Sequence, residues 1–219
     1  MSLDPRIDRG TRAMLALRRA RLDAGERPLG WKVGFGAPAA FALLGTDRPL
    51  VGFLTDRGLI HDGATVAIGD WANPMLEPEI AAHIGAGGAI AGLSAAIELA
   101  DVDVPPADPE AILAGNIYHR HFMLGPVDSG RSDGAGIGAR LLRGGEAVAA
   151  TDDPAALTGD VVEVVRLTGE LLATCGEELR DGDVVITGSV VPPLSVAPGD
   201  TVIAELGPLG RLSVTLTGS

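Results

Sequence analysis

The segment Met75-Leu76-Glu77-Pro78-Glu79-Ile80 predicts an extended strand at a sheet edge or beside a cavity. Pro78 disfavours the helical conformation for the residue before it and has no N–H to donate to a neighbouring strand. In an extended chain, Glu77 and Glu79 point to the same face, roughly 6.5–7 Å apart. These carboxylates repel each other unless a cation lies between them, and Mg²⁺ or Mn²⁺ suits carboxylate oxygens. The alternative is a solvated edge strand whose glutamates bind nothing.

A third carboxylate would complete such a metal site. Glu98 is the first candidate, because it lies within the apolar segment 95–100. An isolated buried carboxylate is costly and needs a partner or a metal. Asp101 and Asp103 are competing candidates, and Glu98 could instead end an exposed amphipathic helix.

Lys32 is the only lysine in the chain, since sixteen of the 17 basic residues are arginine. The period-two pattern of residues 30–35 places Trp31, Val33 and Phe35 on one face of a strand. Lys32 lies on the other face between Gly30 and Gly34, which leave an open groove above it. A buried lysine can lose its proton and take part in proton transfer. The alternative is an ordinary surface lysine.

The remaining pattern predicts an α+β fold in a single domain, with an N-terminal helical segment (residues 1–28) on a β-rich body (29–219). Asp4 and Pro5 begin a helix that ends near Gly25. A short helix covers 37–44, and residues 80–97 form a strand, a glycine turn and a second buried element. Short strands are expected at 161–167, 184–187, 201–206 and 211–216, and residues 207–210 join the last two in a hairpin. Residues 126–155 are expected to be loop with one short strand.

Composition limits the classes of partner. The 219 residues carry a formal net charge of −12, which argues against a nucleic acid or an anionic membrane as the main partner. A single cysteine, Cys175, excludes an intrachain disulfide framework. The chain opens without a charged-then-apolar leader, so a cytoplasmic location is expected.

Two further motifs are weaker. Gly34-x-Gly36-x-x-Ala39 with Asp56 downstream has the skeleton of a dinucleotide-binding turn, but no alternating strand–helix run follows it. The pair His119 and His121 could bind a metal or relay protons, or simply lie in a polar turn.

Taken in order, the motifs resemble the fumarylacetoacetate hydrolase superfamily, in its 2-keto-4-pentenoate hydratase and 4-oxalocrotonate decarboxylase branch. The resemblance covers nearly the whole chain. It is carried by Gly30-Trp31-Lys32-Val33-Gly34, by Gly45-Thr46-Asp47-Arg48-Pro49 with Gly52-Phe53-Leu54-Thr55-Asp56, by Pro74-Met75-Leu76-Glu77-Pro78-Glu79-Ile80-Ala81, by Ile97-Glu98-Leu99-Ala100-Asp101, and by Gly182-Asp183-Val184-Val185-Ile186-Thr187-Gly188 with the closing hairpin.

The resemblance implies a β-rich fold, a homo-oligomer, and a magnesium or manganese ion held by Glu77, Glu79 and Glu98. It implies 2-oxo or 2-hydroxydienoate substrates from the catabolism of aromatic compounds, whose carboxylate and C2 oxygen chelate the metal. Lys32 would donate a proton or orient water near the chain carbons. The predicted substrate-binding residues are Thr187, Gly188 and His119.

The sequence departs from the pattern of this branch at several positions. Leu50 stands where hydratases commonly have Asp, Asp101-Val102-Asp103 replaces Asp-Ser-Arg, and Asn116-Ile117-Tyr118-His119 replaces Asn-Ala-Ser-Ser. The prediction is therefore a metal-dependent lyase, a hydratase or decarboxylase, whose exact substrate stays open. The alternatives are an acylpyruvate-type C–C hydrolase and a non-catalytic oxo-acid-binding or partner subunit.

Overall fold

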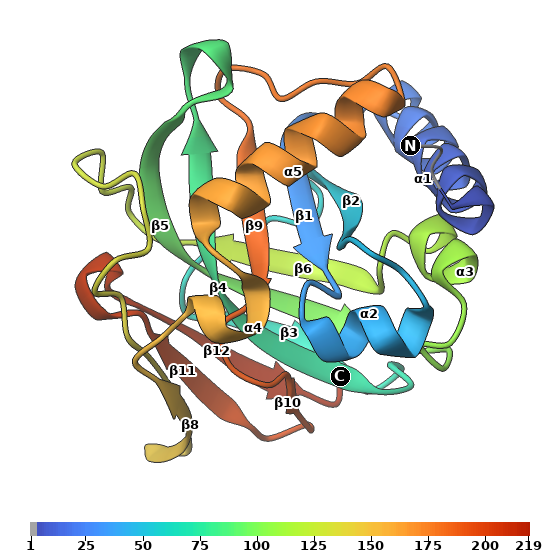
Figure 1. Ribbon diagram of the computed structural model, residues 1–219. Coiled ribbons are helices and arrows are strands. Elements are labelled where there is room, and N and C mark those ends of the chain that lie inside the picture. Colours follow the sequence, from blue (N-terminus) through green and yellow to red (C-terminus); the bar gives the residue numbers. More distant parts are fainter. Residues whose placement is uncertain (1–3) are drawn as a thin grey trace.

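The computed structural model describes residues 4–219 and contains two mixed β-sheets with helices packed around them (Figure 1). The helices are α1 (Pro5–Asp23), α2 (Pro38–Leu44), α3 (Pro109–Ala114), α4 (Ala155–Thr158) and α5 (Val161–Thr174), with 3₁₀ turns at Ala86–Gly88 and Gly207–Leu209. The β-rich fold with an N-terminal helix confirms the predicted fold class.

The larger sheet has the strand order β2-β1-β9-β4-β5-β6, with β10 paired to β4, and the smaller has the order β3-β12-β11-β7-β8. The strands are β1 (Pro28–Gly34), β2 (Leu50–Thr55), β3 (Ala64–Ala67), β4 (Pro74–Ile84), β5 (Ile90–Asp101), β6 (His119–Leu124), β7 (Ala139–Arg143), β8 (Glu146–Thr151), β9 (Val184–Ser189), β10 (Leu194–Ser195), β11 (Thr201–Glu205) and β12 (Arg211–Thr217). Most neighbours are antiparallel, but β1 and β9 are parallel, as are β12 and β3.

Helix α1 covers the outer face of β1 and β2, and its start confirms the predicted cap. The Asp4 carboxylate accepts a hydrogen bond from a backbone N–H of the first turn at 2.8 Å. Near the other end, the Arg18 guanidinium lies 4.8 Å from the centre of the Trp31 ring. The Arg21 guanidinium lies 5.4 Å from the Phe53 ring. These cation–π contacts fix α1 over the face of β1 opposite to Lys32.

The expected strand at 161–167 is wrong, because these residues form the first half of α5. Asp160 caps the helix by accepting hydrogen bonds from the N–H groups of the first turn. The buried positions follow helical spacing through Val161, Val164, Val165, Thr168, Leu171 and Leu172. Burial of this apolar face outweighs the strand preference of the β-branched residues. Helix α5 lies across the larger sheet in Figure 1.

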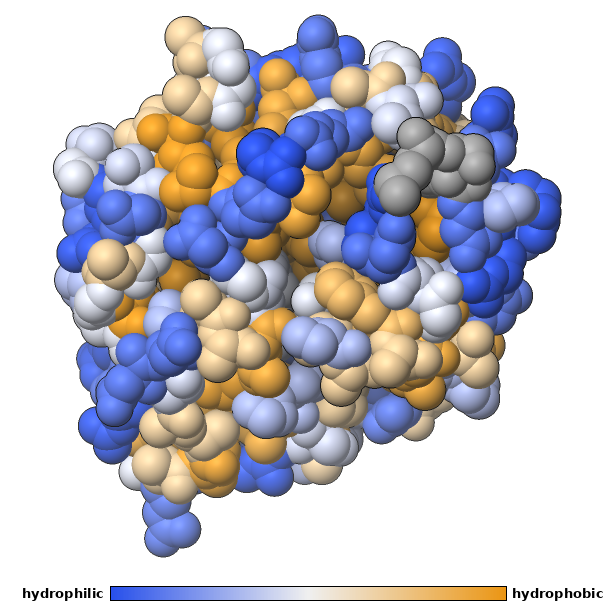
Figure 2. Space-filling model, in the orientation of Figure 1, coloured by the Kyte–Doolittle hydropathy of each residue, from blue (hydrophilic) through white to orange (hydrophobic). Residues whose placement is uncertain are grey.

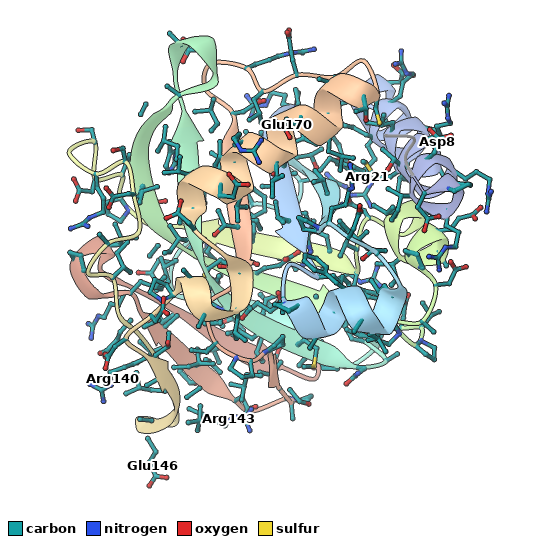
Figure 3. All side chains as sticks on the ribbon, in the orientation of Figure 1. Asp8, Arg21, Arg140, Arg143, Glu146 and Glu170 are labelled. Atoms are coloured by element: carbon teal, nitrogen blue, oxygen red, sulfur yellow. The ribbon has the colours of Figure 1, made fainter. Side chains whose placement is uncertain are left out.

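The expected loop at 126–155 is also partly wrong, because it contains two paired strands rather than one. Strands β7 and β8 form an antiparallel hairpin that places Arg143 opposite Glu146. The two residues between them, Gly144 and Gly145, both have positive φ, which a two-residue hairpin turn of type I′ requires. Charged side chains of this hairpin, including Arg140, lie at the outside of the molecule (Figure 3).

Strands β4 and β5 confirm the predicted strand, glycine turn and second buried element. They pair antiparallel from Pro74 opposite Asp101 to Ile84 opposite Ile90. This register places Glu77 directly opposite Glu98. Among residues 4–219, no helix is long and apolar enough to cross a membrane.

Gly30 allows β1 and β9 to pair closely. Its φ is +140°, and a Cβ atom there would lie 2.0 Å from the Val184 carbonyl oxygen. We therefore expect Gly30→Ala to lower the free energy of unfolding by about 3 kcal/mol, measured by urea denaturation. Gly63→Ala is the matched control. Its φ is +76°, but no atom lies within 4 Å of the added methyl group, so about 1 kcal/mol is expected. Equal losses for the two variants would contradict the steric explanation.

Candidate active site

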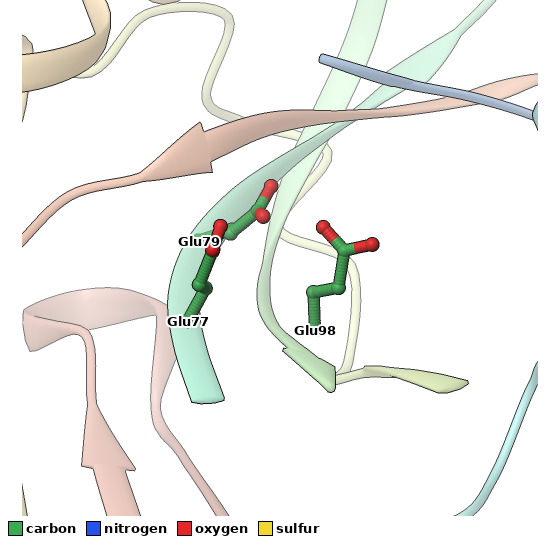
Figure 4. Close-up of side chains that lie close together, drawn as sticks. All are labelled: Glu77, Glu79 and Glu98. Atoms are coloured by element: carbon green, nitrogen blue, oxygen red, sulfur yellow. The ribbon is translucent and has the colours of Figure 1, made fainter. Parts of the chain in front are cut away.

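Three glutamates converge at the centre of the larger sheet (Figure 4). Glu77 and Glu79 project from the same face of β4, as their spacing predicts, and Glu98 projects from β5 beside them. One carboxylate oxygen of each lies within 4.8 Å of the others. Asp101 and Asp103, the competing candidates, are not part of this group; both face Arg120.

Burial makes this group of negative charges costly. Glu79 and Glu98 are fully buried. Burial and the charge of Glu98 raise the pKa of Glu77 to about 7, although Lys32 opposes the shift. Burial and the two neighbouring carboxylates raise the pKa of Glu79 well above its usual range. The three carboxylates therefore carry more negative charge than Lys32 alone can balance, and a bound cation would supply the missing positive charge.

Two cationic or donating side chains hold Glu98 in its charged form. Lys32 Nζ donates to Glu98 Oε1 at 2.5 Å, and His119 Nδ1 lies 2.7 Å from the same oxygen. Burial opposes ionisation, yet Lys32 and His119 together lower the pKa of Glu98 to about 2. Glu98 thus stays ionised while Glu77 and Glu79 accept protons readily.

The free carboxylate oxygens fit a hard divalent cation. Glu79 Oε2 accepts a hydrogen bond from the Gly188 N–H at 2.7 Å, which leaves Oε1 without a partner. Glu98 Oε2 is likewise buried without a partner. Buried unpaired oxygens cost free energy, and oxygen ligands are those that Mg²⁺ and Mn²⁺ prefer. Together with Glu77, these oxygens form a suitable ligand set for such an ion.

A left-handed turn before β6 positions Lys32. Asn116, Ile117 and Tyr118 have φ values of 57°, 53° and 61°, a conformation that β-branched and bulky residues rarely adopt. The Asn116 side chain holds the turn by bonding both backbone groups of Phe53, at 2.8 and 3.0 Å. The Ile117 carbonyl then accepts a second hydrogen bond from Lys32 Nζ at 3.0 Å. Backbone strain of this kind is concentrated at functional sites.

The predicted substrate-binding residues lie at different places. Gly188 lines the cavity described next, and its N–H contacts Glu79. Thr187 donates its hydroxyl to the Ile80 carbonyl at 2.9 Å and does not line that cavity. His119 is 8% exposed and contacts Glu98 rather than the cavity. Their role in substrate binding stays a prediction.

A cavity of about 520 Å³ opens above the carboxylates, with Lys32 and Glu77 in its lining. Helix α2 forms part of its wall, and Figure 2 shows apolar residues gathered over this helix in the lower half of the view. Sequence reasoning missed Asn73 as a cavity residue and placed Phe35 wrongly, on the strand face opposite to Lys32. Strand β1 ends at Gly34, and Phe35, with a φ of 57°, lines the same cavity as Lys32. A site with two charged groups at one end of a mostly apolar cavity suits a small organic acid.

Three of the residues at which the sequence departs from the pattern of the resembled branch lie in or against one apolar cluster. Leu50 and Tyr118 belong to a single apolar cluster, and Val102 packs against it. Leu50 follows α2, Tyr118 precedes β6, and Val102 follows β5. Tyr118 and Val102 also line the cavity, so this apolar cluster forms part of its wall.

Metal binding should depend on pH. The raised pKa of Glu77, about 7 against the usual 4.5, means that a proton competes with the cation below neutral pH. A raised carboxyl pKa also destabilises the metal-free fold progressively from pH 4.5 to about 7. We therefore expect the rise in melting temperature on adding Mg²⁺ to be larger at pH 8 than at pH 6, and proton release on binding at pH 6.5 by calorimetry. The exposed Glu146→Gln variant should change neither result.

The chain matches no protein-family model, but it is similar to proteins of two related kinds. It is 30% identical to 2-keto-4-pentenoate hydratase of Burkholderia vietnamiensis over 209 residues, 88% of this chain and 79% of that protein. It is 26% identical to 4-oxalocrotonate decarboxylase of a Pseudomonas species over 212 residues, 90% of this chain and 82% of that protein.

Solved structures agree. 4-Oxalocrotonate decarboxylase from Pseudomonas putida G7, complexed with magnesium and adipate, superimposes with a TM-score of 0.83 at 27% identity, covering 93% of this chain and 83% of that one. Fumarylpyruvate hydrolase from Pseudomonas aeruginosa, in complex with Mn²⁺ and pyruvate, has a TM-score of 0.67 at 21% identity, covering 88% of this chain and 90% of that one, and shares the fold.

Proposed function

The chain belongs to the 2-keto-4-pentenoate hydratase and 4-oxalocrotonate decarboxylase branch of the fumarylacetoacetate hydrolase superfamily, and we propose that it is a metal-dependent lyase acting on a short 2-hydroxydienoate or 2-oxo acid. The observation that carries the proposal is the group of three carboxylates, two of them with a buried unpaired oxygen, beside the buried Lys32. Residues 1–219 act as one catalytic domain in this proposal.

Glu77, Glu79 and Glu98 would hold a Mg²⁺ or Mn²⁺ ion. When bound, such an ion supplies Lewis acidity and positive charge beside the carboxylate and C2 oxygen of an α-oxo acid. The Gly188 N–H orients Glu79, and His119 and Lys32 orient Glu98. These contacts leave one oxygen of each carboxylate free.

Lys32 is the proposed catalytic residue. An ammonium group has three N–H donors, and two of them are directed to Glu98 and to the Ile117 carbonyl. Because Lys32 also lines the cavity, the third N–H is available to a substrate. It would donate a proton to a chain carbon or orient a water molecule there.

A direct assay distinguishes the reactions. Magnesium-dependent loss of the dienol absorbance of 2-hydroxypenta-2,4-dienoate without release of carbon dioxide indicates hydration, and gas release from 4-oxalocrotonate indicates decarboxylation. EDTA should abolish either activity. Metal binding without turnover of any such acid would favour the non-catalytic alternative and contradict the proposal.

The hydrolase alternative has less support. Hydrolysis of an acylpyruvate needs a general base that can reach water in the cavity. No histidine within residues 4–219 lines the cavity, and His119 is directed to Glu98 instead. Release of pyruvate from acetylpyruvate would reverse this ranking.

The setting of the enzyme is also a proposal. The net charge of −12 supports a small-molecule substrate rather than a nucleic acid or an anionic membrane as the partner. A homo-oligomer is proposed from the resemblance to this branch alone, because a single exposed apolar side chain such as Leu43 is common on monomers. Light scattering of the purified protein tests this point.

A further inference from the structure

Resting on the proposed function, we propose that the substrate is a monocarboxylic acid whose end remote from the C1 carboxylate is an alkyl or aryl group, rather than a dicarboxylic acid. The inference comes from the wall of the cavity, which has two chemically different ends. One end holds Lys32 and Glu77, beside the other two carboxylates, and suits the α-oxo acid head group. The remote end determines which tail the substrate carries.

The charged side chains of the cavity are all at one end. Among residues 4–219, only Lys32 and Glu77 are charged in the lining. Lys32 already pairs with Glu98 at 2.5 Å and cannot also neutralise a second carboxylate at the remote end. An ionised carboxylate placed against apolar groups without a partner loses its hydration and gains nothing in return. A dicarboxylic acid would therefore bind poorly.

Most polar side chains of the wall already have partners. The Tyr118 hydroxyl donates to the Val104 carbonyl at 3.1 Å, so this side chain presents its ring to the cavity. The Ser189 hydroxyl donates to the Val191 carbonyl at 2.6 Å. The Thr158 hydroxyl lies 3.2 Å from the Pro154 carbonyl. These groups have no hydroxyl hydrogen left to donate to a second carboxylate.

Asn73 is the fourth polar side chain of the lining; it is exposed and uncharged, so it cannot neutralise a carboxylate. The other uncharged side chains of the wall are apolar. The rings of Phe35 and Tyr118 lie 6.4 Å apart at an angle of 54°, and both pack in the cluster that contains Ile117. Val102 packs against the same cluster and also lines the cavity. A volume of about 520 Å³ leaves room for a tail well beyond a five-carbon acid. Each methylene buried there should strengthen binding about fourfold.

Calorimetry in the presence of Mg²⁺ tests the inference with a matched pair of ligands. 2-Oxohexanoate and 2-oxoadipate have six carbons and the same head group, and differ in the terminal carboxylate. We expect 2-oxohexanoate to bind at least tenfold more tightly. Equal affinity, or tighter binding of 2-oxoadipate, would overturn the inference. Oxalate, which is only a head group, is the reference. If oxalate binds but 2-oxohexanoate is not preferred, the inference fails and the proposed function stands. If oxalate does not bind, the proposed function fails and the inference fails with it.

A gain-of-charge variant gives an independent test. Ala40 on α2 lines the cavity and is half-buried, whereas its neighbour Ala39 is exposed and outside the lining. Ala40→Arg adds the missing cation, so the affinity ratio should shift at least tenfold toward 2-oxoadipate. Ala39→Arg adds the same charge outside the cavity and should leave the ratio unchanged. Equal shifts in the two variants would mean that general charge, and not the cavity wall, sets the preference.

Discussion

Replacing Glu79 by glutamine is expected to abolish metal-dependent turnover and, at the same time, to make the metal-free protein more stable. The glutamine keeps the shape of the side chain, and its carbonyl can still accept the Gly188 N–H. Its neutral amide cannot supply the anionic oxygen that a divalent cation needs. Loss of the ion should lower kcat/KM about 10³-fold or more.

The stability gain follows from the electrostatics of the site. Burial and two neighbouring carboxylates raise the pKa of Glu79 well above 4.5, so its charge opposes folding at neutral pH. Removing that charge should raise the midpoint of urea denaturation in EDTA. The gain should vanish below pH 4.5, where the carboxyl is protonated in the unfolded protein as well.

Glu98→Gln is the matched comparison. It makes the same change at another proposed metal ligand, but it should lower the stability of the metal-free protein, whereas Glu79→Gln should raise it. The pKa of Glu98 is lowered to about 2, so its charge stabilises the fold above pH 4.5 and this contribution is lost as the pH falls toward 2. Removing the charge leaves Lys32 buried beside a neutral amide, at a cost of about 3 kcal/mol at pH 7. Metal binding by either variant, or loss of stability in both, would contradict the proposed site.

Lys32→Met is expected to lower kcat about 10²- to 10⁴-fold while metal binding survives. The variant removes the proton donor but none of the three carboxylates. It also removes a positive charge from beside the site, so Mg²⁺ should bind as tightly as in the wild type or more tightly. Calorimetry of metal binding beside steady-state kinetics measures both effects. Undiminished turnover would exclude the amine from the mechanism.

Lys32→Arg separates the charge of Lys32 from its proton. Methionine leaves Glu98 without its cation, which should lower the stability of the metal-free protein by about 3 kcal/mol. Arginine keeps a positive charge there but holds its proton too strongly to transfer it. Arginine should therefore restore most of the stability and little of the activity. Full recovery of activity would reduce the role of Lys32 to that of a counter-ion.

Local patterns predicted the parts of the site that a single element creates. The spacing of Glu77 and Glu79 on either side of Pro78 required only an extended chain, and the glycines flanking Lys32 required only one strand. The position of Glu98 opposite Glu77 depends on the register of β4 and β5, which the short turn at residues 85–89 sets. The apolar segment around Glu98 indicated that this carboxylate is buried and needs a partner, but it did not indicate that Glu77 lies opposite it.

The remaining features depend on contacts distant in the chain. Leu50 and Ile117 belong to one apolar cluster although they lie 67 positions apart in the chain, so this cluster could not be predicted from either segment. The strand expected at 161–167 was wrong because that interval stops short of Thr168, Leu171 and Leu172, which complete the helical period. The hairpin of β7 and β8 did have a local signal, the pair Gly144-Gly145, which the glycine-rich surroundings obscured.

The position of the single lysine also decides how this protein can be handled at the bench. Lys32 is 2% exposed and bonded to Glu98, so an amine-reactive dye or resin finds no accessible lysine side chain on the native fold. Acylation at position 32 by a reagent too large to enter the cavity then requires the sheet to open. The rate of that labelling, followed by mass spectrometry, reports how often the catalytic core opens, without any engineered probe.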